Sequence, residues 1–520
     1  LQFLIESLQQ APIFILAISR SIDAGTISKV VERGNKLLKE NFHTITLQNL
    51  SIDESERLLF QLITTPALPE SLRTQILQRA AGVPFYLEEI LRMLIDEGLI
   101  HYRDGRWEMV TEADISSLGV PETLQDLILA RIDRLGDSQR RLLQVASVIG
   151  KNFSLPVLKK VLHNASHESI ERTLASLVDR EFILPKDEAN RNSLALEYTF
   201  RHILMSDAIY STLLRRERRK LHGQVGAAIE ELYANRLDGH VELLANHYRW
   251  SLHLDKALHY LILAGQKATR NHVNEQARQH FEVALELLPQ VSHTPYQELQ
   301  VNMGMGDVLV FSGEYPTAQK HYQQALDSIS DETSGKYAEE FSTLFRKLAR
   351  THERQGDYDQ ALGFLEEAQS ALDGAPSPKP VERAQIWNDV AWIHFRRGNF
   401  AEAEQLLLEA LDLVRASDAY DAIASIYNRL GGVAYNQGEW DQAAGYLRKS
   451  IAIRESIGDV VGLATSFNNL GLLEVEMGEF DNALKNLTAS YELKARLGQA
   501  EGIAMALNNV GWLRIQRGEL

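Results

Sequence analysis

The sequence predicts a mainly α-helical protein whose second half is a solenoid of helix pairs, preceded by a short α/β segment and a region of helices and small hairpins. Three observations lead to this fold class. Similar segments recur at a spacing of 40 residues towards the end of the chain. Leu, Ala, Glu and Gln, which favour helices, are frequent throughout. A short apolar run near the start is typical of a buried strand.

The composition indicates several folded units and argues against some classes of function. The chain has 520 residues, enough for about three or four folding units. Its formal charge of −16 argues against a nucleic-acid surface as the main feature, because binding phosphates requires clustered Lys and Arg. It has no cysteine, which excludes disulfides, and we expect no metal site. We find no apolar stretch of about 18 residues, so we expect no membrane span and a cytoplasmic location.

The first element is a strand. Residues 13–17, Ile-Phe-Ile-Leu-Ala, form an unbroken apolar run that follows a helical pattern over residues 1–10. A run of this kind predicts a strand buried on both faces in a parallel sheet. Further on, Ser51 or Asp53 is expected to cap a helix that begins a periodic apolar stretch.

The next elements are a proline-led helix and a hairpin. Pro84 follows Gly82 and Val83, and a proline fits the first position of a helix because its missing N–H is not needed there. The segment LIHYRDGRWEMV predicts a short β-hairpin whose turn is Asp104-Gly105.

The second half carries the strongest pattern, a repeat with a glycine at its central turn. Each copy predicts two antiparallel helices, and glycine permits the reversal because it accepts backbone angles that other residues resist. Counting an earlier copy without this glycine, we expect six complete units from about residue 256 to 499 and a truncated seventh. The turn glycines are Gly313, Gly356, Gly398, Gly438, Gly478 and Gly518.

Residue sizes within the repeats predict how the helices pack. Small residues are expected where helices cross closely, and large residues are expected to fill the gaps between neighbours. These patterns resemble the tetratricopeptide repeat family in its longer, 40-residue form, in which stacking of neighbouring units stabilises the array. The small positions are Gly431, Gly471, Ala443 and Ala483, and the large ones include Trp440, Phe480 and Leu447.

A column of asparagines accompanies the repeats, at Asn388, Asn428, Asn468 and Asn508. An amide offers both a donor and an acceptor and can pair with a peptide backbone of any sequence. In the kinesin-light-chain type of tetratricopeptide domain, asparagines placed like this line the concave groove and hold an extended peptide, so the resemblance implies a protein or peptide ligand here. The alternative is that these amides bond to neighbouring repeats and only fix the stacking.

The strings AGVPFYLEEILRMLIDEGLI and VPETLQDLILARIDRLGD in the first half resemble the STAND signalling ATPases, in particular the bacterial cyclase- and kinase-associated members. The resemblance implies that residues 1–50 are the C-terminal part of a P-loop ATPase α/β core and that 51–133 are a helical lid with a short hairpin. It further implies a winged-helix-like domain over 134–235, with residues 181–185 and 196–201 as its wing, and a buried arginine in the Arg-x-Asp-x-Leu motif that starts at Arg131. The repeat solenoid then occupies 236–520.

The same resemblance assigns nucleotide-binding roles to four residues. Arg20 matches an arginine that senses the γ-phosphate, Gly82 and Pro84 match a motif whose proline packs on adenine, and His202 matches a histidine that contacts the β-phosphate of ADP. Alternatively, Arg20 is an ordinary surface arginine, and His202 only caps or packs at a helix start.

One expected element is missing from the sequence. The pattern G-x-x-x-x-G-K-[ST] is absent, since Gly150-Lys151 is followed by Asn152 and Gly335-Lys336 by Tyr337. We therefore interpret the chain as a fragment that begins after the P-loop and its acidic strand and is not catalytic alone, with Mg²⁺ expected only with those parts. We expect an ATP/ADP-dependent signalling switch that can self-assemble on activation. The alternative is a non-catalytic scaffold with a degenerate ATPase half.

Overall fold

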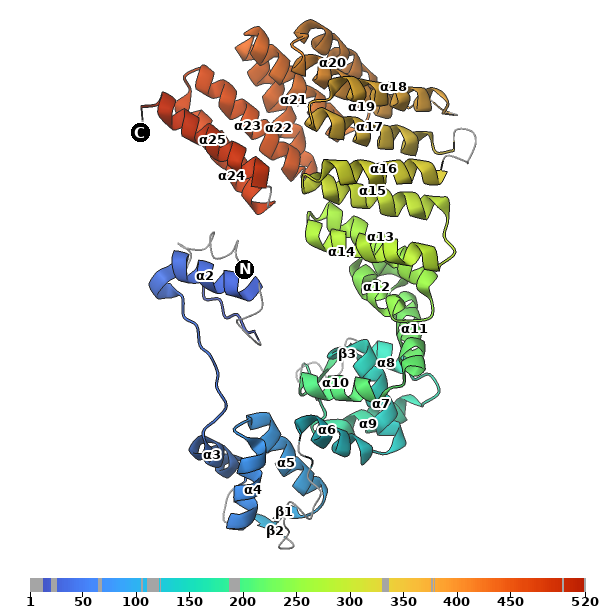
Figure 1. Cartoon of the computed structure of the whole chain (residues 1–520), viewed down its shortest axis with the longest axis vertical. Coiled ribbons are helices and arrows are strands. Elements are labelled where there is room, and N and C mark those ends of the chain that lie inside the picture. The colour runs from blue at the N-terminus through green and yellow to red at the C-terminus, as the bar shows by residue number, and fades with distance from the viewer. Residues whose placement is uncertain are drawn as a thin grey trace. The chain divides into compact units, whose positions relative to one another are not determined.

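The computed structural model describes residues 13–19, 26–63, 68–103, 106–109, 121, 123–186, 197–329, 336–375, 377, 379–497 and 500–518. The chain divides into two compact units, which Figure 1 shows from blue to red along the sequence. The first unit is Leu1–His240 with Trp250–Leu252, and the second is Val241–Arg249 with His253–Leu520. Within the described ranges, no helix combines the length and the apolar character that crossing a bilayer requires.

Residues 13–19 form no strand, so the buried strand that the apolar run predicts is wrong. The segment is extended and its side chains are exposed, with Phe14 and Ile18 each 89% accessible. A parallel strand needs hydrogen-bonded neighbours. The strands among the described residues form two antiparallel sheets elsewhere, so this segment has no sheet to join. Residues 1–10 and Arg20 lie outside the described residues.

The first unit opens with helices and a hairpin. Ser51 caps α3 and forms a capping box with Glu54, which confirms the predicted helix start. Pro84 is the first residue of α5, also as predicted, and the predicted hairpin is confirmed because Ile100 pairs with Met109 and Arg103 with Arg106. Its turn, residues 104–105, is outside the described residues. The elements are α2 (Thr26–Leu38), η1 (Lys39–Asn41), α3 (Ile52–Leu62), α4 (Glu70–Ala80), α5 (Pro84–Asp96), β1 (Ile100–Arg103) and β2 (Arg106–Met109).

The rest of the first unit surrounds a three-stranded antiparallel sheet in the order β3-β5-β4. Ile183 of β4 pairs with Phe200 of β5, which confirms the pairing predicted for residues 181–185 and 196–201. The elements are α6 (Leu124–Asp133), α7 (Asp137–Ile149), β3 (Asn152–Ser154), α8 (Leu155–Val161), α9 (His167–Asp179), β4 (Ile183–Pro185), β5 (Glu197–Phe200), α10 (Ile203–Thr212), α11 (Arg215–Leu232) and η3 (Ala234–His240).

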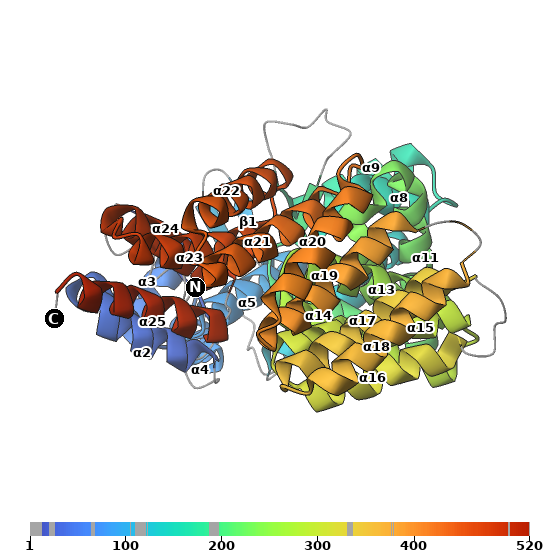
Figure 2. The ribbon, with the colours of Figure 1, turned by 90° about the horizontal axis from the view of Figure 1, so that it is seen from above.

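The second unit is an array of helix pairs that lie side by side (Figures 1 and 2). Among the residues that the structure describes, six pairs and one further helix follow α12 (Val241–Arg249), which agrees with the predicted number of units. The pairs are α13 (Leu254–Arg270) and α14 (Asn274–Leu287), followed by η4 (Leu288–Gln290), α15 (Pro295–Phe311) and α16 (Tyr315–Ile329), α17 (Ala338–Arg354) and α18 (Tyr358–Asp373), α19 (Pro380–Arg396) and α20 (Phe400–Val414), α21 (Tyr420–Gln437) and α22 (Trp440–Ile457), α23 (Val460–Glu476) and α24 (Phe480–Arg496), then α25 (Ala500–Gln516).

The turns within the pairs depend on glycine. The six turn glycines have φ between +76° and +83°, a region that residues with a side chain rarely adopt. Inside the pairs, Ala443 and Leu447 are 0% and 1% exposed, as the size pattern predicts. Trp440 is 42% exposed, so the prediction that it fills a gap between neighbours is wrong. It is the first residue of α22, next to the turn, where fewer side chains surround it.

The close approach of α21 and α22 predicts opposite effects for two adjacent glycines. A Cβ at Gly431 would lie 2.7 Å from Cγ of Leu447, whereas a Cβ at Gly432 would meet no atom within 4 Å. We expect G431A to lower the free energy of unfolding by about 1–3 kcal/mol through overpacking. We expect G432A to raise it by up to about 1 kcal/mol, because alanine favours a helix over glycine. Urea unfolding of both variants measures the difference, and equal effects would contradict the packing described.

Candidate functional site

The N-terminus of α5 is held in place by a close backbone approach at Gly82. The chain leaves α4 through Ala81 and Gly82, both with positive φ, and the amide of Leu50 donates to the carbonyl of Gly82 over 2.8 Å. A Cβ at Gly82 would lie 2.1 Å from the carbonyl oxygen of Leu50, so only glycine fits here. This contact fixes where Pro84 begins the helix.

His202 lies beside the start of α5. It caps α10, and its Nδ1 accepts a hydrogen bond of 3.2 Å from the amide of Leu204. A neutral imidazole that accepts at Nδ1 carries its proton on Nε2. The ring of Phe85, the residue after Pro84, stacks on the imidazole with centroids 4.0 Å apart and planes 17° apart. Two regions separated by more than a hundred residues thus meet at this pair of rings.

Ion pairs join the same two regions. Glu181, just before β4, pairs with Arg92 of α5 at 2.5 Å and with Arg201. Arg201, next to His202, also lies 3.8 Å from Glu88. These side chains are partly exposed, so each pair contributes little stability by itself, but together they restrict how α5 sits against the strands.

A buried ion pair lies behind this surface. Glu89 of α5 is fully buried and pairs with Arg131 of α6, whose side chain is 2% exposed. Arg131 also donates to the carbonyl of Arg180 over 3.1 Å and lies 4.7 Å from the ring centroid of Phe182. The buried arginine predicted for the Arg-x-Asp-x-Leu motif is therefore present. Burial raises the pKa of Glu89, and the charge of Arg131 offsets only part of that effect.

The predicted nucleotide residues have different positions in the structure. Pro84 and His202 are brought together through Phe85, and Gly82 shapes the approach to Pro84. Arg20 is not among the described residues. Sequence reasoning missed Phe85 as a partner of His202, because an aromatic residue in a helix gives no sign of what it stacks on. In the part of the chain that the structure describes, no group of three or more His, Cys, Asp or Glu side chains could hold a metal ion.

The asparagine column makes contacts between repeats. Asn428 Oδ1 accepts hydrogen bonds from Ser466 Oγ at 3.0 Å and Asn469 Nδ2 at 3.3 Å, both from α23. Asn468 Oδ1 accepts one of 2.8 Å from Asn509 Nδ2 of α25.

The two ends of the asparagine column differ. Asn388 is 4% exposed and donates to Ser425 Oγ over 3.1 Å, while its buried Oδ1 has no hydrogen-bond partner. Asn508, at the other end, is exposed. The amides of Asn388, Asn428 and Asn468 therefore join neighbouring helix pairs.

Family comparisons agree with this architecture. The family model described as tetratricopeptide repeat matches residues 297–373 and 382–456. A second model, described as a domain of unknown function (DUF8739), matches residues 51–108, which include α5 and most of the hairpin.

Comparisons with individual proteins give a curated relative and similar folds. An uncharacterized protein of Rhizobium meliloti (strain 1021) is 23% identical over 341 residues, which are 64% of this chain and 31% of that protein. The chain thus spans about a third of the curated relative's length. Among solved structures, a signal transduction ATPase with numerous domains (STAND) with a tetratricopeptide repeat sensor, from Pyrococcus horikoshii, has a TM-score of 0.55 at 12% identity, covering 92% of this chain and 65% of that one. The quorum sensor NprR from B. thuringiensis has a TM-score of 0.40 at 15% identity, covering 55% and 78%.

The chain therefore has the fold that its sequence predicts, a mainly helical protein with tetratricopeptide repeats in its second half. The same fold occurs in a STAND protein with a repeat sensor. Repeats of this type point to protein–protein interaction.

The buried pair predicts a strong, pH-dependent loss of stability when Arg131 is removed. In R131M, Glu89 keeps a buried charge without its partner, so we expect the free energy of unfolding to fall by about 3–5 kcal/mol at pH 7. The pKa of Glu89 rises further above its unfolded value of about 4.3. Stability is then retained below the unfolded pKa and lost as the pH rises through the folded one, so the defect shrinks on acidification. Urea unfolding between pH 5 and pH 8 measures this.

Two controls separate the charge from the packing. The double variant E89Q/R131M carries no buried charge and should lose the extra pH dependence. K186M removes a pair with Glu197 whose side chains are about half exposed, so it should cost less than about 1 kcal/mol. A pH-independent defect in R131M would contradict the role of Glu89.

The contacts of Asn428 predict a structural effect of its removal. N428A removes the acceptor of the Asn469 amide and one of the two partners of the fully buried Ser466 hydroxyl, which also lies 3.0 Å from Ser450 Oγ, so it should cost about 1 kcal/mol. N482A is the matched control, because Asn482 is exposed and bonds only to Glu479 within its own helix turn, and it should change stability by less than about 0.5 kcal/mol. Unchanged thermal stability of N428A would instead favour the peptide-binding role that the resemblance implies.

Proposed function

We propose that this chain is the regulatory half of a nucleotide-dependent signal-transduction switch of the STAND class, with a repeat array that binds a protein or peptide. The observation that carries the proposal is the stacking of Phe85 on His202, since it places the imidazole beside the helix that Pro84 begins. In the family that the sequence resembles, this proline and this histidine contact the same ADP. The partner-binding part rests on the tetratricopeptide repeats.

The order of elements after α6 supports a winged-helix-like domain. A helix, a strand, two helices and two strands follow one another from α7 to β5, and the sheet order is β3-β5-β4. This is the arrangement expected of a three-helix domain with a β-wing. His202 lies two residues after the end of β5, so movement of the domain away from α5 would carry the imidazole with it.

The residues present fit part of a bound ADP. Pro84 has no N–H to leave unsatisfied against a base, and His202 carries its proton on Nε2, the form that donates to a phosphate oxygen. They offer no phosphate cradle, because the P-loop pattern is absent from the sequence. The proposal therefore assigns the other phosphate contacts and Mg²⁺ to a P-loop outside these 520 residues, and γ-phosphate sensing to Arg20.

His202 and the ion pairs would control a closed state. The histidine would join the nucleotide to the winged-helix-like region while Glu181 bridges Arg92 and Arg201. A partner bound to the repeats would open this state only if it has a higher affinity for the open form. Self-assembly on activation is part of the same proposal.

The asparagine column also belongs to the proposal, with a more limited role. Asn508 is exposed and offers its amide to a peptide, whereas the unused acceptor of Asn388 is buried and would need the neighbouring repeat to move before a peptide could reach it. Asn428 and Asn468 already use theirs between repeats, and a peptide would have to replace those bonds.

The decisive test is nucleotide retained by the full-length protein. We expect ADP in the purified wild type, released on denaturation and quantified by chromatography, and a large loss of it in H202A. F85A should also reduce retention, because it removes the ring that positions the imidazole. H163A is the matched control, since His163 is an exposed histidine of the same region, and it should retain wild-type levels. Absence of nucleotide from both the wild type and H202A would overturn the proposal.

A further inference from the structure

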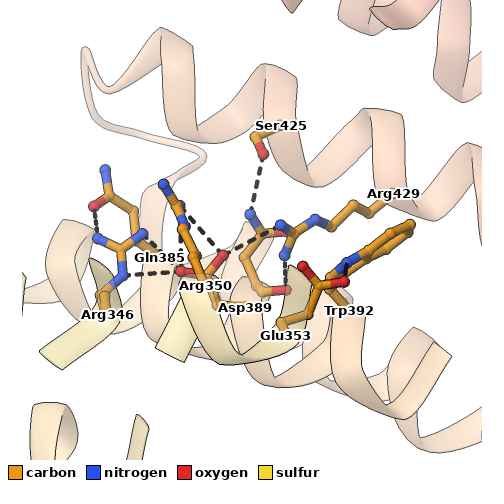
Figure 3. Close-up of polar contacts among 9 residues, drawn as sticks. Arg346, Arg350, Glu353, Gln385, Asp389, Trp392, Ser425 and Arg429 are labelled. Carbon is orange, nitrogen blue, oxygen red and sulfur yellow. Dashed lines mark hydrogen bonds and ion pairs between the residues drawn. The ribbon is translucent and has the colours of Figure 1, made fainter. Parts of the chain in front are cut away.

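Three arginines of the repeat array converge on one buried aspartate. Asp389 of α19 is 4% exposed. Arg346 of α17 contacts its Oδ2 at 3.0 Å through Nη2 and 3.1 Å through Nε. Arg350 of α17 lies 3.2 Å from the same oxygen, and Arg429 of α21 lies 3.2 Å from Oδ1 (Figure 3). The first helices of three consecutive pairs therefore meet at a single carboxylate.

The cluster contains more positive charge than Asp389 can neutralise. Burial opposes ionisation of Asp389, but the charges of Arg350, Arg346 and Arg429 together hold the pKa of Asp389 well below its usual range. One carboxylate facing three guanidinium groups leaves an excess of two positive charges. Other acidic groups offset this only in part, since Asp307 is already paired with Lys347 at 2.5 Å. The negative charge of Glu382 attracts the guanidinium of Arg346 from beyond contact distance.

Two of the arginines are committed to the fold and one faces solvent. Arg346 also donates to Gln385, and Arg429 also donates to the backbone carbonyl of Asn388. The side chains of Arg346 and Arg429 are 11% and 19% exposed, whereas that of Arg350 is 57% exposed. Arg350 donates to Asp389 through Nη2 alone, which leaves the other edge of its planar guanidinium for a second carboxylate.

An aromatic surface borders the cluster. Trp392, one turn after Asp389 on α19, donates from Nε1 to Glu353 over 2.9 Å. The guanidinium of Arg429 lies 5.4 Å from its ring centroid, and that of Arg396 lies 5.8 Å from it on the same helix. A cation beside an indole ring is partly desolvated, which strengthens its attraction for an anion.

We propose that the cluster around Asp389, with Arg350 as its contact residue, binds the side-chain carboxylates of an acidic peptide segment on a protein partner. This deepens the partner-binding part of the proposed function and rests on it, but not on the nucleotide switch. The geometry favours a carboxylate, because the cluster already holds one through the same planar donors. Tetratricopeptide repeats point to a protein as the source of that carboxylate. The excess of positive charge is a local property of this cluster, because the chain as a whole carries a formal charge of −16.

The test uses the full 520-residue chain and two labelled peptides of equal length, one rich in glutamate and one rich in glutamine. Fluorescence anisotropy in low salt should show binding of the glutamate peptide alone, weakening as salt rises. R350Q should weaken this binding about tenfold, which corresponds to about 1.4 kcal/mol. R350K should restore little, because an ammonium lacks the planar fork of donors.

R415Q is the matched control. Arg415 follows the last residue of α20, its side chain is 72% exposed, and it pairs only with Asp412. Its removal should change the affinity by less than about twofold. Circular dichroism checks that R350Q folds. Nucleotide retention is measured separately and should be unchanged in R350Q, because Arg350 is not among the proposed nucleotide contacts.

Four outcomes would overturn the proposal. They are no binding of the glutamate peptide, equal binding of both peptides, an unchanged affinity in R350Q, and an equal loss in R415Q. In a competition experiment, unlabelled glutamate peptide should displace the labelled one. If an anionic oligonucleotide or inorganic phosphate displaces it at a lower concentration, the site binds phosphates instead. If R350Q has a lower thermal stability but an unchanged affinity for the peptide, the cluster only holds neighbouring repeats together.

Discussion

Stacking between neighbouring helix pairs is the constraint on which the second unit depends. A single pair buries one face and leaves the other apolar, so no pair is stable without its neighbour. The helices of a pair approach closely where Gly431 and Gly471 face Leu447 and Leu487, and there a single methyl group would not fit. Because every first helix touches the pair before and the pair after, polar side chains on these helices are buried between repeats and must find partners there.

That requirement explains the two polar features of the array. The position nine residues before the turn glycine holds Lys347, Asp389, Arg429, Asn469 and Asn509 in successive repeats. Its residues reach back to the preceding repeat: Asn469 and Asn509 bond to Asn428 and Asn468, and Arg429 bonds to Asn388 and Asp389. One column of the repeat therefore makes amide contacts near the end of the array and ionic contacts in its middle. The excess charge arises where Asp389 of this column meets Arg429 of the same column and two arginines from other positions of α17, Arg346 and Arg350.

The sequence predicts local features well and partners across the fold poorly. The turn glycines, the start of α5 at Pro84 and the hairpin of β1 and β2 follow from rules about a few adjacent residues, and the structure confirms them. The run at residues 13–17 has the apolar character of a buried strand, but a strand also needs neighbours, and composition does not supply them. The Asp389 cluster was missed because we followed one column of asparagines. Reading the adjacent column would have shown alternating charge, although not that Arg350, from a different column, completes the cluster.

Burial decides which charges are structural and which can act on a ligand. Glu89 and Arg131 are both buried, so their mutual attraction mainly offsets the cost of removing both charges from water. The pair holds α5 against α6. Around Asp389 the balance differs, because two arginines are enclosed and the third reaches solvent. A ligand carboxylate that pairs with Arg350 would compete with Asp389 for that guanidinium and would also relieve the repulsion among the three arginines. The second effect is shared by α17, α19 and α21, so binding at one side chain would alter the stacking of three consecutive pairs. In an array stabilised by its nearest neighbours, the ion pairs between repeats are one place where the proposed partner binding would be coupled to repeat geometry.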